Sequence, residues 1–261
     1  MAGGKYNALK DLLCSLRQVA VAFSGGVDSS FLLWAAHEVL GPEKVTAIFA
    51  DSIVQLPEEG RRAVQTAKFI GVNLNIIKFD ILALAEFRAN GVERCYFCKR
   101  HIFSSFSESL KPDTILIDGT NLDDSRQIRP GARACRELGV RSPLLEAGIT
   151  KKEIRSMSRE RGLATWARHS ASCLATRIAF DQPITAEDLT IVAKAENFLH
   201  KMGFMGCRLR LRGTTATIEL AAGDISRLME DNCRQQMADF CYSLGLKKVL
   251  LDLCEREGIL F

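Results

Sequence analysis

Short apolar segments rich in β-branched residues alternate with longer segments of helical periodicity through the first half of the chain. Residues 31–40 and 58–70 have the helical spacing, and they end at Gly41 and Gly71, which are helix-stop signals. The apolar segments between and around them predict a buried strand at residues 18–23 and three further strands at residues 45–50, 74–79 and 114–117. Strands that alternate with helices predict βαβ crossovers, and therefore a doubly wound, mostly parallel α/β sheet.

The pattern changes after Pro183. Before it, Thr150 and Glu153 form a capping box that opens a helix over residues 151–161. After it, the pattern predicts a helix from Thr185, two short alternating strands joined at Gly213, further helix and a last strand. The predicted ranges are 185–202 and 224–244 for helix, and 208–212, 215–220 and 248–253 for strands. We therefore predict a main domain over residues 1–183 and a smaller α+β domain over residues 184–261.

Polar residues follow three of the predicted strands, at residues 24–28, 51–52 and 118–124. In a parallel sheet, ligands bind beyond the carboxyl ends of the strands. These segments therefore predict a ligand site, and Ser52 is expected to contribute to it.

Composition narrows the class of protein. Of 261 residues, 47% are hydrophobic and 25% charged, which excludes a disordered tail, a coiled coil and a collagen-like fibre. The net charge of +4 suits a phosphorylated small molecule but is too small for a dedicated nucleic-acid binder. No apolar run approaches the roughly 18 residues of a membrane span, and the first residues contain no apolar signal segment. We expect a cytoplasmic protein that acts on a small-molecule nucleotide, not on membranes or nucleic acid.

A glycine-rich loop lies between the first predicted strand and helix. Two glycines let backbone amides approach an anion, and the helix N-terminus adds the positive end of its dipole. The expected ligand-binding residues are Ser24, Gly25, Gly26, Asp28, Ser29 and Ser30, with Asp28 as a Mg²⁺ ligand. The alternative is a glycine turn that only permits strand-to-helix packing. The chain has neither GxxxxGK[ST] nor GxGxxG at this position. The main sequence evidence for a P-loop NTPase or a Rossmann dinucleotide-binding fold is therefore missing.

The string Ser-Gly-Gly-Val-Asp-Ser at residues 24–29 resembles the SGGxDS pyrophosphate loop of the adenine-nucleotide alpha hydrolase superfamily. Those enzymes split ATP between its α and β phosphates, giving an adenylate and pyrophosphate. The resemblance implies ATP and Mg²⁺ as cofactors, and adenylation as the first chemical step.

Three of the nine cysteines are candidates for chemistry. Cys95 and Cys98 form a CxxC in a predicted short helix, and Cys173 lies in a loop of small residues. No second CxxC completes a four-thiolate zinc site, whereas three thiolates suit a [4Fe–4S] cluster with one iron left open. The alternative is a pair of helix thiols and an unrelated buried cysteine. The remaining six are expected to be small buried hydrophobes: Cys14, Cys135, Cys207, Cys233, Cys241 and Cys254.

Five further stretches, taken in order with the loop, resemble the ATP-dependent sulfur transferases that build the nickel-pincer nucleotide cofactor of lactate racemase. They are ERCYFCK at 93–99, DGTNLDD at 118–124, RPG at 129–131, ELGVRSPL at 137–144 and SCLATR at 172–177. The resemblance covers almost the whole chain. It implies adenylation of a carboxylate of a pyridinium dicarboxylate mononucleotide, followed by replacement of AMP with sulfur to give a thiocarboxylate.

That family has two sulfur strategies. In one, a single cysteine at the Cys173 position gives up its own sulfur and becomes dehydroalanine. In the other, three cysteines bind a [4Fe–4S] cluster that carries a sulfide. This sequence has Cys95, Cys98 and Cys173, and so matches the cluster-bearing form. It departs from the family at Thr176, where serine is expected, and at residues 178–181.

Lys99 and Asp124 are expected to join Cys173 in catalysis. Lys99 follows the CxxC and can meet a phosphate or move a proton; the alternative is a surface lysine. Asp124, with its neighbour Asp123, follows a strand and can bind Mg²⁺ or orient substrate; the alternative is a helix cap.

Several arginines are expected to bind the nucleotide. Residues 208, 210 and 212 alternate with period two, which places Arg208, Arg210 and Arg212 on one face of a strand. Three guanidinium groups on one face repel one another unless an anion or carboxylates neutralise them, and a nucleotide phosphate is such an anion. The alternative is an outer face exposed to solvent. Arg177 is a further expected nucleotide contact, and Glu196, Glu219 and His169 are weaker candidates.

Two other functions compete with this one. A tRNA thiolase would use the same loop and cluster, but would need a broad basic surface with exposed aromatic side chains. A regulatory module that binds ATP without turnover would leave Asp28 and the three thiols unexplained. We also expect a homo-oligomer, assembled through the smaller domain, and transient contacts with other cofactor-assembly proteins.

Overall fold

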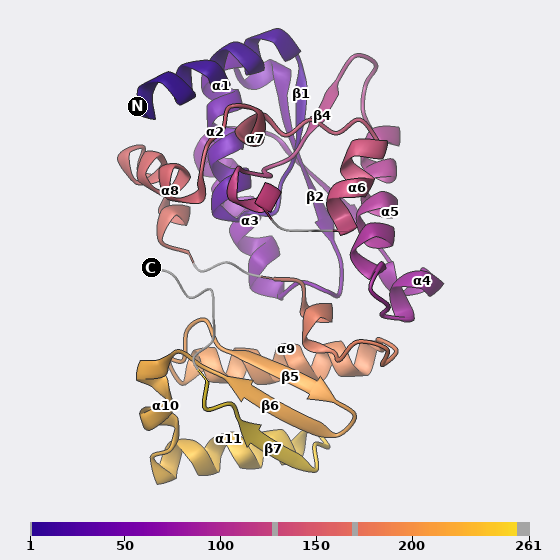
Figure 1. The fold of residues 1–261 in the computed structure, drawn as a ribbon, viewed down its shortest axis with the longest axis vertical. Coiled ribbons are helices and arrows are strands. Elements are labelled where there is room, and N and C mark those ends of the chain that lie inside the picture. Colours follow the sequence, from indigo (N-terminus) through magenta and orange to yellow (C-terminus); the bar gives the residue numbers. More distant parts are fainter. Residues whose placement is uncertain (1, 127–129, 169–171, 255–261) are drawn as a thin grey trace. The chain divides into compact units, whose positions relative to one another are not determined.

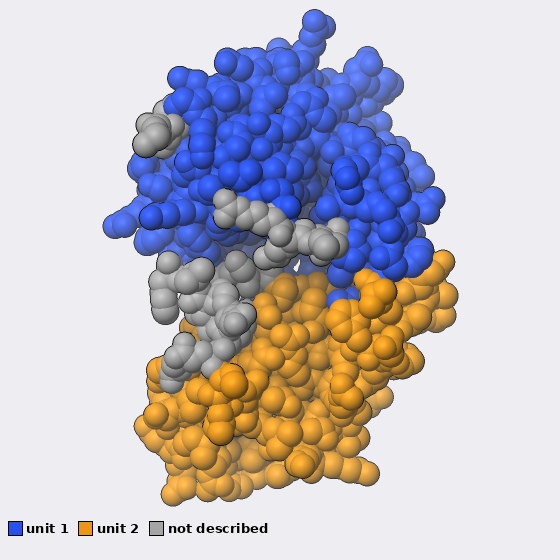
Figure 2. All heavy atoms as spheres, in the orientation of Figure 1, with its two compact units in different colours: residues 1–80, 93–168 blue, residues 81–92, 169–261 orange. Residues whose placement is uncertain are grey.

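The computed structural model describes residues 2–126, 130–168 and 172–254. The chain forms two compact units, coloured separately in Figure 2. The first comprises Met1–Asp80 and Glu93–Arg168, and the second comprises Ile81–Val92 and His169–Phe261. The predicted boundary at 183/184 thus lies inside the second unit, which also takes in the excursion at residues 81–92.

The first unit is built on a parallel four-stranded sheet in the order β3-β2-β1-β4. The strands are β1 (Val19–Ala22), β2 (Val45–Asp51), β3 (Leu74–Lys78) and β4 (Ile115–Ile117). Val19 at the start of β1 is level with Val45 on one side and with Ile115 on the other. All four strands were predicted from the hydrophobic pattern, and the expected α/β fold with a parallel sheet is confirmed.

Helices cover both faces of this sheet (Figure 1). Their bounds are α1 (Ala2–Leu16), α2 (Val27–Leu40), α3 (Pro57–Ile70), α5 (Arg94–Glu108), α6 (Pro130–Glu137), α7 (Pro143–Glu146) and α8 (Lys151–Glu160). One face packs against α1, α2, α3, α7 and α8, and the other against α5 and α6. The capping box predicted for the helix after Thr150 is present, with Glu153 as its second member.

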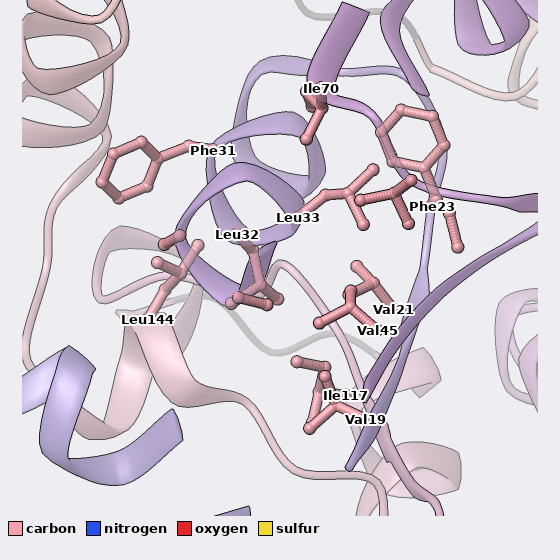
Figure 3. Close-up of a cluster of buried hydrophobic side chains, with 14 of the residues drawn as sticks. Val19, Val21, Phe23, Phe31, Leu32, Leu33, Val45, Ile70, Ile117 and Leu144 are labelled. Carbon is pink, nitrogen blue, oxygen red and sulfur yellow. The ribbon is translucent and has the colours of Figure 1, made fainter. Parts of the chain in front are cut away.

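Alternation along β1 explains how one strand serves two cores. Val19 and Val21 point into the cluster around α2, where Phe31 and Leu144 are fully buried (Figure 3). Ala20, between them, faces the second cluster under α5 and α6. Because successive side chains of a strand point to opposite faces, the short run Val-Ala-Val is apolar throughout and buried on both sides.

The second unit contains a three-stranded sheet in the order β5-β6-β7. Strands β5 (Arg208–Arg212) and β6 (Thr215–Glu219) are antiparallel, and β7 (Lys248–Leu251) runs parallel to β6. Its helices are α4 (Ala85–Arg88), α9 (Ala186–Lys201), α10 (Ala222–Leu228) and α11 (Asp231–Ser243). The helical segments predicted over residues 224–244 correspond to α10 and α11.

Asn90 ties the excursion at residues 81–92 to the rest of the second unit. It is fully buried in a left-handed conformation, with φ of +56°. Its side-chain amide donates to the carbonyls of Ala179 at 2.8 Å and Gln182 at 2.9 Å. Asparagine tolerates this backbone region, and its buried amide donates to a carbonyl on each side of the turn at residues 179–182.

Three features differ from the sequence-based expectations. Helices α1, α4, α6 and α7 were not predicted from the pattern. Helix α2 begins at Val27, so residues 27–30 are its first turn and not loop. Cys14 and Cys254 are exposed, which corrects the expectation that all six remaining cysteines are buried. None of the helices within residues 2–126, 130–168 and 172–254 is both long and apolar enough to span a bilayer.

Candidate active site

The glycine loop after β1 is shaped by a close approach to α3. Gly25 has φ of +72°, and a Cβ atom there would lie 3.2 Å from the Cα and Cβ of Ala63. Gly26 is the N-cap of α2, with φ of −75°. Of the two, only Gly25 therefore requires glycine for its own backbone geometry; the ligand contact expected of Gly26 remains a prediction.

Serine hydroxyls hold the loop closed. The Oγ atoms of Ser24 and Ser29 lie 3.1 Å apart, and the Ser24 amide donates to Ser29 Oγ at 3.2 Å. The Gly26 amide donates to Ser24 Oγ at 3.3 Å. The next amides, of residues 27–29, belong to the first turn of α2, where a helix cannot pair its own N–H groups. A preformed loop with such amides is a site for an anion.

The segment after β4 lies directly against this loop. A Cβ atom on Gly119 would be 2.9 Å from the backbone nitrogen of Ser29, so only glycine fits this approach. Two residues later, the side-chain amide of Asn121 donates to Asp28 Oδ1 at 3.4 Å. The predicted gathering of polar segments at the carboxyl ends of β1 and β4 is therefore confirmed.

Asp28 is paired with Lys151, the first residue of α8. The Lys151 ammonium donates to Asp28 Oδ2, and the two side chains are 28% and 24% exposed. Burial raises the pKa of Asp28, and the adjacent Lys151 ammonium opposes that rise. Asp123 fixes the start of α8, because its Oδ2 accepts from the Lys151 amide at 2.8 Å. Asp124 accepts from the Asn121 amide at 3.1 Å, and its charge acts on Asp28.

Arg168 is a second cation at the loop that sequence reasoning missed. Its guanidinium donates to the carbonyl of Gly25 at 2.8 Å. Burial and the charge of Arg62 lower the pKa of Arg168. Arg155 holds the backbone here by donating to the carbonyls of Trp166 and Arg168. No local sequence signal marks Arg168, because its partner lies 143 residues earlier.

Two predicted serines have buried hydroxyls without a partner. Ser52 follows β2, the neighbour of β1, and Ser30 lies in the first turn of α2. Within the described residues neither Oγ atom has a hydrogen-bond partner. Buried polar atoms are normally satisfied, so these two hydroxyls lack a partner that such atoms usually have.

The CxxC pair lies in the first turns of α5. Cys95 is exposed and Cys98 partly exposed, and their i,i+3 spacing places them on one face of the helix. Lys99 is 41% exposed; its Nζ lies 3.8 Å from Asp118 Oδ2 and 3.7 Å from Cys135 Sγ. The aliphatic part of the Lys99 side chain packs against Gly131 of α6. A Cβ atom added to Gly131 would lie 2.8 Å from Cδ of Lys99. Lys99 is thus directed toward the end of β4.

Asp118 is the buried carboxylate at that end. Its oxygens accept from Ser142 Oγ at 2.7 Å and from Thr120 Oγ1 at 2.8 Å, and it is 4% exposed. Burial raises the pKa of the neighbouring thiol of Cys135. Sequence reasoning had only placed Asp118 in a polar strand end; these contacts make it the centre of a polar network under α5.

The Cys173 loop in the second unit is clamped by a buried arginine. Arg177 donates Nε and Nη2 to the two carboxylate oxygens of Glu196, at 2.8 and 3.0 Å. Its Nη1 donates to the carbonyl of Ser172 at 2.8 Å and to that of Cys173 at 3.3 Å. Arg177 is 6% and Glu196 1% exposed. Arg177 therefore positions the backbone of the loop; a direct contact with nucleotide remains a prediction.

The arginines of β5 alternate as predicted, with Leu209 and Leu211 buried on the opposite face. Arg210 donates to both oxygens of Glu219, at 2.6 and 3.3 Å, and to the carbonyl of Thr176 at 2.6 Å. Arg208 is partly buried and Arg212 exposed. The carboxylate of Glu219 thus neutralises the Arg210 guanidinium.

The predicted site residues therefore fall in both units. The glycine loop, Ser52, the CxxC, Lys99 and Asp124 belong to the first; Cys173, Arg177 and the β5 arginines belong to the second. Residues 127–129 and 169–171, which include His169 and the arginine of the RPG stretch, lie outside the described residues. In the described part of the chain, no three His, Cys, Asp or Glu side chains meet to hold a metal ion.

Comparisons with known proteins agree with the geometry of the loop. The NAD synthase family model matches residues 8–94, which contain it. An uncharacterized protein of Synechocystis is 35% identical over 97% of this chain and 95% of its own length. A Methanocaldococcus jannaschii protein, also uncharacterized, is 29% identical over 91% of this chain and 90% of its own length.

One relative has an assigned activity. The pyridinium-3,5-bisthiocarboxylic acid mononucleotide synthase of Lactiplantibacillus plantarum is 32% identical over 250 residues, 94% of this chain and 88% of the relative. Identity at this level, over nearly the full length of both proteins, establishes common membership. This chain belongs to the family of that synthase and is an ATP-dependent sulfur transferase.

Proposed function

We propose that this protein adenylates a carboxylate of a pyridinium dicarboxylate mononucleotide and replaces the AMP with sulfur, in nickel-pincer cofactor biosynthesis. The observation that carries the proposal is the 32% identity, over 94% of the chain, to a synthase named for a bisthiocarboxylic product. A carboxylate does not exchange its oxygen for sulfur unaided, because oxide is a poor leaving group. Adenylation converts that oxygen into the leaving AMP, and this requires an ATP-binding loop.

The first unit provides the groups for adenylation. The amides at the start of α2 and the hydroxyls of Ser30 and Ser52 bind the phosphates, and Asp28 holds Mg²⁺. Asp28 suits a cation, because its Oδ2 atom already accepts a hydrogen bond from the Lys151 ammonium. Carboxylate oxygens are also the ligands that Mg²⁺ prefers. Lys99 contacts a phosphate or moves a proton, and Asp124 binds Mg²⁺ or orients the substrate.

The thiols of Cys95, Cys98 and Cys173 would hold a [4Fe–4S] cluster. The donor set fits: two thiols share a helix face in the first unit, and a third lies in the second unit on a loop whose carbonyls Arg177 holds. With three thiolate ligands, such a cluster leaves one iron open and supplies a sulfide to the activated carboxylate. Arg177 keeps Cys173 in place, and Arg208, Arg210 and Arg212 bind the substrate phosphate.

The test is anaerobic purification followed by iron counting and turnover with ATP and the pyridinium dicarboxylate mononucleotide. Wild type should contain about four irons per chain. Cys95→Ala, Cys98→Ala and Cys173→Ala should each lose iron and sulfur transfer but keep substrate-dependent pyrophosphate release. Cys14→Ala, which removes an exposed thiol of α1, is the matched control and should keep its iron.

Mass spectrometry separates the cluster from the sacrificial strategy. Loss of H₂S would leave Cys173 about 34 Da lighter after a single turnover, with Cys95→Ala as active as wild type. That result would refute the cluster. A protein that releases pyrophosphate with a tRNA and not with the nucleotide would refute the substrate.

A further inference from the structure

Asp118 is a buried carboxylate at the carboxyl end of β4, and the reaction proposed above leaves it without a role. Oδ1 accepts from Ser142 Oγ at 2.7 Å and from the Thr120 amide at 3.1 Å, and Oδ2 accepts from Thr120 Oγ1 at 2.8 Å. The residue is 4% exposed, so its side chain is fixed by the protein and shielded from water. A carboxylate in such a place is costly to keep charged without a cation.

Lys99 is that cation. Its Nζ lies 3.8 Å from Asp118 Oδ2, and no other basic side chain of the described residues is within ion-pair distance of this carboxylate. The Lys99 stem packs against Gly131, and its ammonium lies 5.4 Å from the ring centre of Phe103. Cys135 contacts both charges, because its Sγ is 3.7 Å from Nζ and 3.7 Å from Oδ2. These contacts together set the direction of the ammonium.

The two members of the pair are unequally exposed. The Lys99 side chain is 41% exposed and that of Asp118 is 6% exposed. The carboxylate therefore holds the ammonium from the protein side, while its other side is open to a ligand. The separation of 3.8 Å makes an ion pair but exceeds the length of a hydrogen bond, so the carboxylate does not use up the three donors of the ammonium.

The segment that carries Asp118 is fixed against the phosphate loop. Gly119, the next residue, approaches the first turn of α2 so closely that a Cβ atom would lie 2.9 Å from the Ser29 nitrogen. A side chain held by Asp118 is therefore held at a defined place relative to that turn, where the ATP phosphates are proposed to bind.

We propose that Asp118 is the positioning residue for Lys99, and that its carboxylate holds the ammonium at the carboxyl end of β4 for the reaction. Asp118 acts through Lys99 and does not itself meet ATP or substrate, because Ser142, Thr120 and the thiol of Cys135 contact its oxygens. Without the carboxylate, the flexible four-carbon stem lets the ammonium leave its place. A group displaced by about 1 Å can cost on the order of 100-fold in rate. The inference rests on the role proposed above for Lys99, contact with a phosphate or transfer of a proton.

A cycle of single and double variants tests whether Asp118 acts through Lys99. Asp118→Asn keeps the size of the side chain and removes its charge, and the hydroxyls of Ser142 and Thr120 can donate to the amide or accept from it. Lys99→Met removes the ammonium but keeps an unbranched side chain. Each should slow substrate-dependent pyrophosphate release roughly tenfold or more, since a charge-assisted hydrogen bond is lost or misplaced. The double variant should stay within about twofold of Lys99→Met, because Asp118 has nothing to position once the ammonium is gone.

Two further variants complete the cycle. Asp113→Asn is the matched control: it makes the same charge change at the other end of β4, where the side chain is exposed and φ is +65°, which asparagine also tolerates. It should match wild type. Ser142→Ala removes one hydroxyl that orients Asp118 and is the milder second variant, in case Asp118→Asn does not fold. It should slow release by a smaller factor, and should have no effect on top of Lys99→Met.

Reductive methylation of the Lys99 amine, followed by mass spectrometry, tests the holding contact without ATP or substrate. An amine held against a carboxylate reacts slowly, so Lys99 should be methylated severalfold faster in Asp118→Asn and at the wild-type rate in Asp113→Asn. Unchanged methylation in Asp118→Asn overturns the proposal. So does a double variant in which the two losses of rate multiply, as a merely structural role requires, or a Lys99→Met protein as active as wild type. If wild type releases no pyrophosphate with the pyridinium nucleotide, the proposed function fails, and methylation still decides whether Asp118 holds Lys99.

Discussion

The ion pair between Arg177 and Glu196 offers the sharpest test of how the Cys173 loop is held. Glu196→Gln removes the negative charge but keeps the size of the side chain. Glu196 is 1% exposed, and its carboxylate accepts from Arg177 Nε and Nη2 and from the Leu209 amide at 3.1 Å. The substitution therefore leaves a buried guanidinium without a counter-charge and places amide hydrogens against it.

The size of the effect follows from that burial. Removing one partner of a buried ion pair costs roughly 3–5 kcal/mol. In a unit of about 100 residues, each kcal/mol lowers the midpoint of thermal unfolding by roughly 4–8 °C. Glu196→Gln should therefore lower the midpoint of the second unit by at least roughly 12 °C.

Differential scanning calorimetry measures the midpoint, and hydrogen exchange of β5 and α9 assigns it to the second unit. The matched control is Glu219→Gln, which breaks the Arg210 pair, where the arginine is 39% exposed. That pair is solvated, so the control should cost about 1 kcal/mol or less. Equal losses in the two variants would refute the argument from burial.

The double variant Arg177→Met with Glu196→Leu separates stability from positioning. It removes both charges, and replacing a buried pair with apolar residues is often neutral. Most of the lost stability should therefore return, while sulfur transfer stays lost because the guanidinium no longer donates to the carbonyls of Ser172 and Cys173. Wild-type sulfur transfer by the double variant would show that the clamp is only structural.

Three further predictions concern the first unit. Asp28→Asn should raise the Mg²⁺ concentration for half-maximal pyrophosphate release at least severalfold, because a metal ligand loses its charge; an unchanged Mg²⁺ dependence would reduce Asp28 to a helix cap. Gly119→Ala should weaken ATP binding by roughly tenfold and lower the midpoint of unfolding, since the new Cβ would lie 2.9 Å from the Ser29 nitrogen; Gly91→Ala, with open space around it, should do neither. The Thr150 amide and Lys5 lower the pKa of Glu153 from 4.5 to about 2, so its stabilisation is complete above about pH 4.5 and is lost as the pH falls toward 2. Glu153→Gln should therefore lower the unfolding midpoint at pH 6 and leave it unchanged at pH 2, and an equal loss at both would contradict the assignment.

Local patterns in the sequence were enough to predict the architecture of the first unit. The apolar runs that became β1 to β4 are short and bounded by turn residues, and both properties are readable without tertiary information. The loop at Ser24 and the capping box at Thr150 are equally local, because each is built from residues within a few positions of one another. The alternation of arginine and leucine along β5 belongs to the same class, since period two is a property of a single strand.

Contacts between distant segments were decided only by the tertiary structure. Lys151 lies 123 residues from Asp28, and Arg168 lies 143 residues from Gly25. Neither basic residue differs in its local sequence from a surface lysine or arginine. The same holds for Arg177, which the sequence suggested as a nucleotide contact and which folding places on Glu196.

One physical reason explains why the sequence predicted some features and only the tertiary structure decided the others. Strand, helix and turn preferences arise from steric and hydrogen-bonding terms within a few residues, so the sequence alone determined the parallel sheet, the phosphate loop and the polar edge beside it. Charge pairing depends on which side chains are brought within a few ångströms and shielded from water, and packing sets both conditions. The tertiary structure therefore decided that Asp28 contacts the Lys151 ammonium, and that the Cys173 loop is held by a buried arginine.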